Sequence, residues 1–177
     1  MKLQCFAPLC FLLFLGWLSQ RSEGRTVIMD KCVVNVHMNE LQKHYSSVRP
    51  SAISGDTAIE VKLLDKTLIS KVTESQSCCF IRLVLRFFVE RVFVNFSATD
   101  PQVQTGVSAI ANGFISIRNT IHKCHCHCEE ETQRTVDSII SQFDKLQTGE
   151  AAKKAVGELD TVLEWLESLS QKARTRK

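Results

Sequence analysis

Apolar residues recur along most of this chain at intervals of three and four, the spacing that places side chains on one face of an α-helix. The first such stripe consists of Val34, Met38, Leu41, Tyr45 and Val48. Asp30 is a suitable N-cap before the stripe. Pro50 is a suitable stop, because a residue that precedes proline disfavours the helical conformation. The pattern therefore predicts a helix between Asp30 and Pro50.

Two later segments carry the clearest helical signals. Residues 78–96 (CCFIRLVLRFFVERVFVNF) are apolar nearly all round, which is typical of a central helix covered on several sides. Asp100 and Pro101 then supply an N-cap and a proline at the first helical position. The stripe that follows runs from Val103 to Ile121 in steps of four and three. We expect a buried central helix followed by a long amphipathic one.

The remaining segments predict two more helices and one mixed stretch. Residues 136–146 carry a further apolar stripe, and the helix-breaking Gly149 separates it from a last helix whose stripe covers 152–169. Residues 51–77 open with a Ser-Gly-Asp turn signal and contain enough Ile, Leu and Val to pack as a short helix or an extended piece. With five or six helices and no convincing strand, the predicted fold class is an all-α bundle.

The first residues have the character of a targeting segment. A lysine near the start is followed by the apolar run CFAPLCFLLFLGWL, which is too short for a membrane span and fits the hydrophobic region of a signal peptide. Ser22 and Gly24 form a small-x-small cleavage pattern. We expect residues 1–24 to be a signal peptide and residues 25–177 to be a secreted helical domain. An uncleaved membrane anchor is the alternative.

Composition narrows the classes of function. The 177 residues are 44% hydrophobic and 23% charged, as in an ordinary globular domain. A formal net charge of +3 is too small for a dedicated nucleic-acid-binding protein. The sequence has no HExxH, GxSxG, Walker or GxGxxG motif, so we expect neither an enzyme nor a cofactor. The basic tail 172–177 is expected to be a solvated end, with a heparin-type contact as the minority interpretation.

Six cysteines follow the signal peptide: Cys32, Cys78, Cys79, Cys124, Cys126 and Cys128. An even number in an exported chain indicates disulfides. Bridges between sequence neighbours are strained. If each late cysteine therefore pairs with one early cysteine, three, then two, then one choice of partner leave six of the fifteen pairings. An extended chain points the three late cysteines the same way, so we expect residues 124–128 to be a non-helical connection across the start of the central helix.

The same cluster admits a metal-binding interpretation. His122, His125 and His127 lie beside the late cysteines, and this mixture resembles zinc or copper ligands. Zinc sites usually place two or more residues between paired ligands, so C-x-C-x-C is too tight for one tetrahedral ion. Disulfides are the preferred interpretation, and a metal-binding protein is an alternative.

The sequence contains one N-x-[ST] sequon, formed by Asn95, Phe96 and Ser97. In a secreted protein it predicts a glycan on Asn95, just past the central helix. Phe96 is also a candidate for the core, and the two roles compete if the asparagine must be accessible.

Three sequence motifs together resemble the pattern of a known protein family. The pair Cys78-Cys79 opens the central apolar segment, residues 108–114 read SAIANGF, and residues 154–160 read KAVGELD ahead of Trp165. In these features the whole mature chain resembles the interleukin-10 family of helical cytokines, most closely its interleukin-19/20 members. The resemblance implies a disulfide-bridged bundle of six or seven helices that acts as a monomer.

The resemblance also implies disulfide pairs. They are Cys32–Cys124, Cys78–Cys126 and Cys79–Cys128. One departure is that only His125 separates the first two late cysteines, where the family pattern has several residues.

The function that the resemblance implies is extracellular signalling. Such proteins bring together two class II cytokine receptor chains, here interleukin-20-receptor-like, and trigger JAK–STAT signalling, with no nucleic-acid partner and no stable membrane insertion. Residues 32–49, 51–72 and 151–169 correspond to the segments that similar proteins use for one receptor chain. The candidate contacts within them are Asp56, Glu60, Lys62 and Glu164. A secreted, disulfide-rich, lipid-binding helical protein is the alternative from another class.

Overall fold

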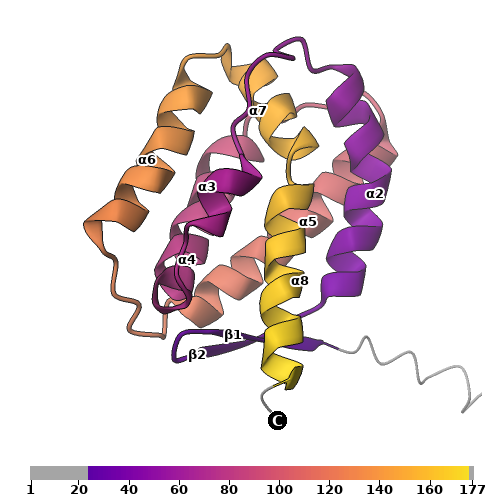
Figure 1. Cartoon of the computed structure of the whole chain (residues 1–177). Coiled ribbons are helices and arrows are strands. Elements are labelled where there is room, and N and C mark those ends of the chain that lie inside the picture. The colour runs from indigo at the N-terminus through magenta and orange to yellow at the C-terminus, as the bar shows by residue number, and fades with distance from the viewer. Residues whose placement is uncertain (1–23, 176–177) are drawn as a thin grey trace, which may run out of the picture.

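Helices stand side by side in the computed structural model, which describes residues 24–175, and a two-stranded hairpin closes one end of the bundle (Figure 1). The predicted helical bundle is confirmed. The signal peptide predicted over residues 1–24 lies, apart from Gly24, outside the described residues. In chain order the elements are β1 (Arg25–Met29), β2 (Cys32–Val36), α2 (Met38–Ser54), α3 (Lys66–Ser70), the 3-10 turn η1 (Glu74–Gln76), α4 (Ser77–Phe87), the π-helical turn η2 (Phe88–Val92), α5 (Pro101–Ile121), α6 (Glu130–Asp144), α7 (Thr148–Gly157) and α8 (Asp160–Thr175).

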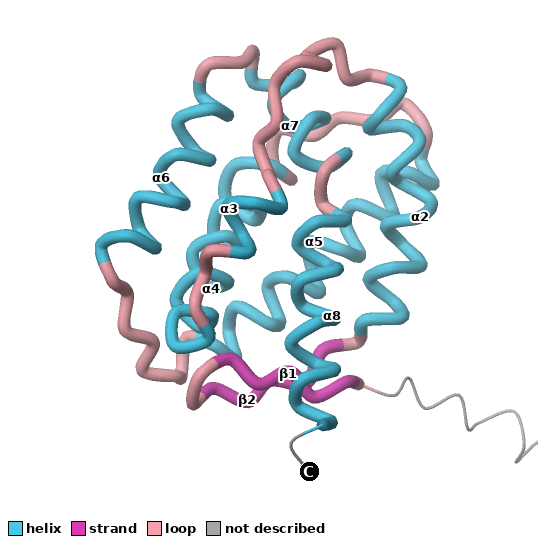
Figure 2. The backbone as a smooth tube through the Cα atoms, in the orientation of Figure 1, coloured by secondary structure: helices cyan, strands magenta, loops and turns pink. Residues whose placement is uncertain are grey.

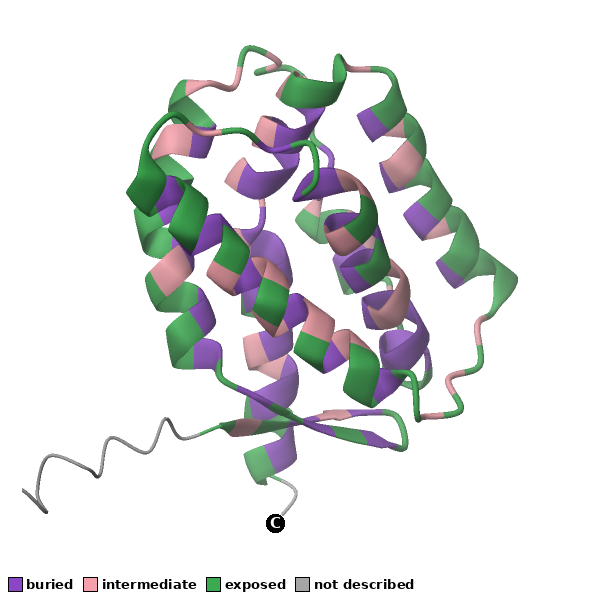
Figure 3. Cartoon of the chain, turned by 180° about the vertical axis from the view of Figure 1, so that it is seen from behind, coloured by how far each residue is buried: buried purple, intermediate pink, exposed green. Residues whose placement is uncertain are grey.

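The continuous segment of α4 and η2 forms much of the core, as its apolar sequence predicts. Phe80 and Phe88 are almost completely buried. Figure 3 shows that the buried positions of the helices lie on their inward faces. The Phe80 ring meets Trp165 of α8 edge-on, with 5.1 Å between centroids. The Phe88 ring meets Phe114 of α5 in the same manner at 5.7 Å. Aromatic pairs prefer this edge-on arrangement. The central segment therefore packs against α8 on one side and α5 on the other through its phenylalanine rings.

Helix α5 begins where the sequence predicts. The Asp100 carboxylate accepts a hydrogen bond from the Gln102 backbone N–H at 2.7 Å, and Pro101 occupies the first helical position. Both features satisfy or remove N–H groups that a helix start leaves without partners. The buried positions include the predicted stripe of Val103, Val107, Ile110, Phe114, Ile117 and Ile121.

Helices α2 and α5 pack closely because two glycines of α5 face α2. A Cβ atom on Gly106 would lie 2.7 Å from Cγ2 of Val48, and one on Gly113 would lie 2.7 Å from Cδ2 of Leu41. Contacts that short require a neighbouring group to move, so a larger residue at either position would displace the Val48 or Leu41 side chain from the interface of the two helices. The spacing of seven residues places both glycines on the same face of α5.

The helix with the predicted stripe of Met38, Leu41, Tyr45 and Val48 is present as α2. Its predicted start at Asp30 is wrong, because residues 25–36 form an antiparallel hairpin in which Val27 pairs with Val34. Alternate residues face the core, the period of a half-buried strand. Asp30 lies in the turn with φ of 55°, a conformation that aspartate tolerates better than most residues. The prediction failed because Val34 happens to be in phase with the apolar stripe of α2, which begins only at Met38.

The predicted stop at Pro50 is also wrong, since α2 continues to Ser54. A proline inside a helix removes one hydrogen bond to the residue four positions before it. Here Pro50 is on the solvent-exposed side, and only one turn follows it. Ala52 in that turn is completely buried, so packing holds the turn in place despite the lost bond.

The single last helix predicted from the sequence is divided into α7 and α8. The break falls at Glu158 and Leu159, and Gly149, predicted to be a breaker, lies inside the first turn of α7. The carbonyl groups at the end of α7 need new partners. The Tyr45 hydroxyl of α2 supplies one by donating to the Gly157 carbonyl at 2.8 Å.

Candidate functional site

The segments expected to contact a partner lie next to one another on one face of the bundle. Helix α2, the loop of residues 55–65 and helix α8 are neighbours in Figures 1 and 2. Ion pairs connect them: Arg49 of α2 lies 3.3 Å from Asp160 of α8. Lys66, directly after the loop, lies 2.6 Å from Glu164 of α8. We call this face, formed by α2, residues 55–65 and α8, the loop face.

A buried group of charges holds the loop of residues 55–65. The Lys154 ammonium on α7 is 2.9 Å from the Asp56 carboxylate and 3.5 Å from that of Glu158. Lys154 is only 6% exposed. A buried charge needs partners of this kind, because taking it out of water without them is costly. The start of the loop is therefore fixed to α7 by Asp56.

The far end of the loop is fixed by Glu158, which belongs with Lys154 to the KAVGELD sequence of residues 154–160. Glu158 accepts hydrogen bonds from the backbone N–H groups of Leu63 and Leu64, at 2.9 and 2.7 Å. Leu63 and Leu64 are themselves buried. Both residues of the KAVGELD sequence that carry these contacts, Lys154 and Glu158, thus act on a segment about 95 positions earlier in the chain. Asp56 is accordingly engaged inside the protein.

The other candidate residues are open to solvent. Glu60 and Lys62 are exposed in the loop. The Glu164 side chain is 61% exposed, even though it is paired with Lys66. Its carboxylate raises the pKa of the Lys66 ammonium through a hydrogen bond and its charge. These three charges lie exposed on the loop face.

Sequence reasoning missed Ile59, which is 85% exposed in the loop. Single exposed apolar side chains are common on protein surfaces, and the position of this one on the loop face is what distinguishes it. It belongs to no helical stripe, and an exposed position cannot be told from a buried one by its letter alone. The only available signal was its place between Asp56 and Glu60 in a segment rich in turn residues.

Tyr45 lies under the loop face and has an unusual environment. Burial raises the pKa of its phenol to about 12, and the nearby negative charge of Asp160 adds to this effect. The phenol and Asp160 also raise the pKa of Arg49, its neighbour one turn along α2. The hydroxyl therefore stays protonated and keeps its hydrogen bond to Gly157 at any ordinary pH.

The opposite end of the bundle is fixed by disulfides. The bonded pairs in the structure are Cys32–Cys124, Cys78–Cys126 and Cys79–Cys128. These are the pairs that the family resemblance implies. The segment 124–128 is non-helical, as predicted, and lies across the first turn of α4 and the hairpin (Figure 2).

The paired cysteines are not thiolate ligands in this structure. Over residues 24–175, no group of three or more His, Cys, Asp or Glu side chains is placed to hold a metal ion. Within the same range, no helix has both the length and the apolar character that a membrane crossing requires.

Asn95 lies in the turn after η2, and its sequon divides into an exposed and a buried half. The Asn95 side chain is exposed and donates to the Arg91 carbonyl at 2.7 Å. Phe96 is 5% exposed and belongs to the core, whereas Ser97 is exposed. Core packing of Phe96 and access to the asparagine are thus compatible, and the glycan stays a prediction.

Comparisons with known proteins cover nearly the whole chain. A family model described as Interleukin 10 matches residues 7–171. Mouse interleukin-20 is 33% identical over 150 residues, which cover 82% of this chain and 85% of that protein. Human interleukin-19 is 27% identical over 171 residues, or 94% of each protein.

Solved structures give the same result for the fold. The crystal structure of human interleukin-19 matches with a TM-score of 0.70 at 28% identity, covering 75% of this chain and 88% of that one. The structure of a PROSS-edited human interleukin 24 matches with a TM-score of 0.67 at 25% identity, covering 81% and 94%.

Proposed function

Since this chain belongs to the interleukin-10 family of cytokines, we propose that it is a secreted signal that brings together two class II cytokine receptor chains of the interleukin-20-receptor type. Receptor pairing then triggers JAK–STAT signalling inside the responding cell. Processing after Gly24, the three disulfides, glycosylation at Asn95 and a monomeric state belong to the same proposal.

The observation that carries the proposal is the ordered loop on the loop face. Asp56 fixes the start of the loop and Glu158 fixes its end, while Ile59 between them is left 85% exposed. A segment that is already ordered loses little conformational entropy on binding. The arrangement suits a ligand that binds its receptor through an ordered surface segment.

Within this surface, Ile59 is the proposed anchor and the charges around it are the proposed rim. Interfaces usually gain most of their binding energy from a few desolvated residues, and exposed charges contribute mainly to specificity. Glu60, Lys62 and Glu164 therefore matter less individually than Ile59. Asp56 contributes through the position of the loop, because its carboxylate is bound to Lys154.

The first experiment measures STAT phosphorylation in matched cell lines. Purified residues 25–177 are added to cells that bear both receptor chains and to cells that lack either one. We expect a response only where both chains are present. An equal response in cells without one chain would contradict the proposal.

The second experiment tests the anchor with a matched control. Ile59→Ser removes an apolar side chain from the loop, and Val94→Ser removes one that is 68% exposed in the turn after η2. We expect Ile59→Ser to weaken receptor binding by about tenfold, the effect of a hot-spot residue, with unchanged thermal stability. Val94→Ser should bind like the parent protein. Equal binding by all three proteins would place the anchor elsewhere.

A further inference from the structure

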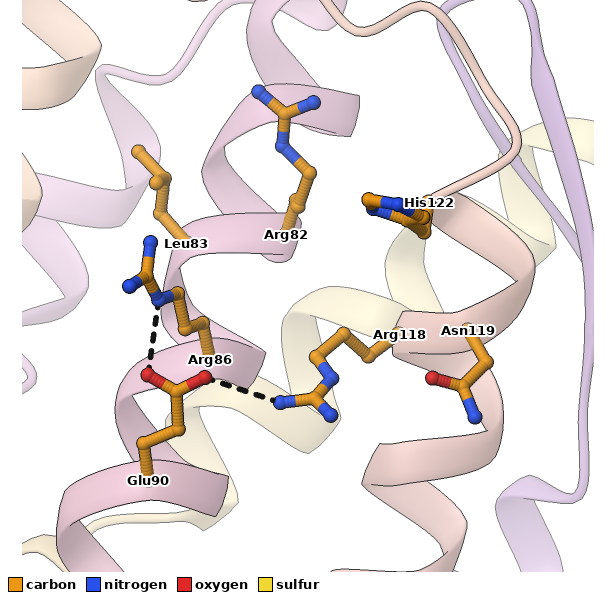
Figure 4. Close-up of a pocket in the computed structure, with 7 residues that line it drawn as sticks. All are labelled: Arg82, Leu83, Arg86, Glu90, Arg118, Asn119 and His122. Carbon is orange, nitrogen blue, oxygen red and sulfur yellow. Dashed lines mark hydrogen bonds and ion pairs between the residues drawn. The ribbon is translucent and has the colours of Figure 1, made fainter.

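A groove rich in arginine lies between α4 and the C-terminal half of α5 (Figure 4). Its volume is about 530 Å³, and it is partly open to solvent. Arg82 and Arg86 project from successive turns of α4, Arg118 projects from the last turn of α5, and His122 directly follows that helix. We call this the α4–α5 groove. It uses neither α2, the loop of residues 55–65 nor α8.

Positive charge in the α4–α5 groove exceeds negative charge. Glu90 is the carboxylate that lines it, and two guanidinium groups share it: Arg86 at 2.9 Å and Arg118 at 3.3 Å. Arg82 instead donates to the sulfur of Cys128 at 3.1 Å, and that atom is neutral in its disulfide. Three guanidinium groups facing one carboxylate leave two positive charges uncompensated among the residues that line the groove.

The disulfides fix the two walls of the groove. Cys78–Cys126 and Cys79–Cys128 attach the segment after α5 to the first turn of α4. The side chains of Arg82 and Arg118 are partly buried and so restricted in movement. A preorganised array of charges binds more tightly than the same charges on flexible side chains, because less side-chain freedom is lost on binding.

We propose that the α4–α5 groove binds a sulfated polysaccharide chain of the cell surface or matrix. Guanidinium groups match the oxygen atoms of a sulfate with two parallel hydrogen bonds. A groove that is partly open to solvent accepts a long polymer. That the protein encounters such polymers depends on its export, which is part of the proposed function.

Other polyanionic partners fit the groove less well. A membrane surface would require exposed apolar side chains beside the charges. The large apolar residues that are exposed within residues 24–175 are Val33, Ile53, Ile59 and Val94, and none of them lines the groove. Single-stranded nucleic acid is usually held by aromatic rings that stack on the bases, and no Phe, Tyr or Trp lines the groove.

The test measures retention on immobilised heparin in a salt gradient. Arg82→Gln/Arg118→Gln removes two groove charges. As the control, Arg134→Gln/Lys145→Gln removes two exposed charges, one in the second turn of α6 and one directly after its end. We expect the groove variant to elute at lower salt and to bind about tenfold more weakly, with a smaller change in the control. Glu90→Gln removes the carboxylate and should increase retention, an effect that misfolding does not explain.

Several outcomes would overturn the proposal. Equal losses in the groove and α6 variants would assign retention to net charge alone. A loss confined to Lys172→Gln/Arg174→Gln would assign it to the C-terminal tail. Undiminished retention on desulfated heparin would exclude sulfate recognition, and binding to phosphoinositide vesicles without binding to heparin would point to a membrane.

A signalling assay separates this proposal from the proposed function. Cells that bear both receptor chains but make no sulfated polysaccharide should respond equally to the parent protein and to Arg82→Gln/Arg118→Gln. Failure of the parent protein to signal would reject the proposed function and leave the heparin result standing. A reduced response to the groove variant in these cells would instead place the groove in a receptor contact.

Discussion

Two irregular segments at opposite ends of the bundle are held by different means. The loop of residues 55–65 is fixed by buried charges, with Lys154 between Asp56 and Glu158. The segment 124–128 is fixed by three disulfides to β2 and α4. Charges hold a segment only in the folded protein, whereas a disulfide also restricts the unfolded chain.

Because of this difference, we expect the disulfides to affect mainly the free energy of unfolding and the buried charges to affect mainly the conformation of the loop face. Loss of a disulfide should lower the free energy of unfolding and leave the folded loop face nearly as it was. Loss of the buried charges should disturb the loop face itself. The following predictions test that division, from the largest expected effect on stability to the smallest.

The largest effect is expected from Cys32→Ser/Cys124→Ser. This disulfide closes the longest loop, with a sequence separation of 92 residues, and such a loop is worth about 4–5 kcal/mol in the chain-entropy model. Denaturant titration should therefore show a free energy of unfolding lower by about 2–5 kcal/mol. Below its unfolding transition the variant should bind receptor almost normally. A large loss of affinity in the folded variant would mean that the two ends are coupled.

Lys154→Met should have the next largest effect. It leaves Asp56 and Glu158 close together in a buried site without a compensating charge, which costs about 3 kcal/mol. Receptor affinity should fall as well, because the loop loses its attachment. Lys153→Met, at the half-buried neighbouring position, is the control and should change both quantities little. Equal effects at the two positions would contradict the role of the ion pair.

Alkaline pH tests the packing beneath the loop face. Tyr45 is the single tyrosine of the sequence, so phenolate absorbance at 295 nm in a rapid pH jump reports on it alone. Its folded pKa of about 12 lies above the ordinary tyrosine value of 10.0. Its contribution to stability is therefore full below pH 10 and is lost as the pH rises toward 12, by about 2–3 kcal/mol. Titration near pH 10 in the folded protein would disprove the buried environment.

The smallest effect on stability is expected from Glu164→Gln. The Lys66–Glu164 pair is exposed on both sides, and pairs of this kind are screened by water and salt. Thermal unfolding should not change measurably. Any change should appear in the association rate with the receptor, since exposed charges act mainly by steering. An unaltered rate would remove Glu164 from the proposed rim.

The sequence predicted best where local signals and tertiary packing agree. Helix α5 was identified because Asp100 and Pro101 mark its start and an unbroken stripe follows. The hairpin was missed because Val34 fits the helical stripe of α2 as well as its own strand. Pro50 was wrongly predicted to end the first helix, because burial of Ala52 maintains the helical turn beyond it.

The candidate site was predictable only in outline. The family resemblance located the segments, but no local pattern reveals that Lys154 pairs with Asp56, which lies 98 residues earlier. Asp56 was therefore predicted to be a candidate receptor contact, whereas its carboxylate is paired with Lys154 inside the protein. Ile59 was missed for the opposite reason, because its exposure depends on how the two ends of the loop are held.

The ion pair between Arg25 of β1 and Glu167 of α8 has a practical consequence for engineering. It brings the first and last described elements together beside the disulfide-fixed end, away from the loop of residues 55–65 (Figure 1). A fluorophore or carrier domain attached at Arg25 or at Thr175 would leave from the same side of the molecule. A short linker that joins these two residues would also permit circular permutation, with new ends opened in the exposed turn between α6 and α7.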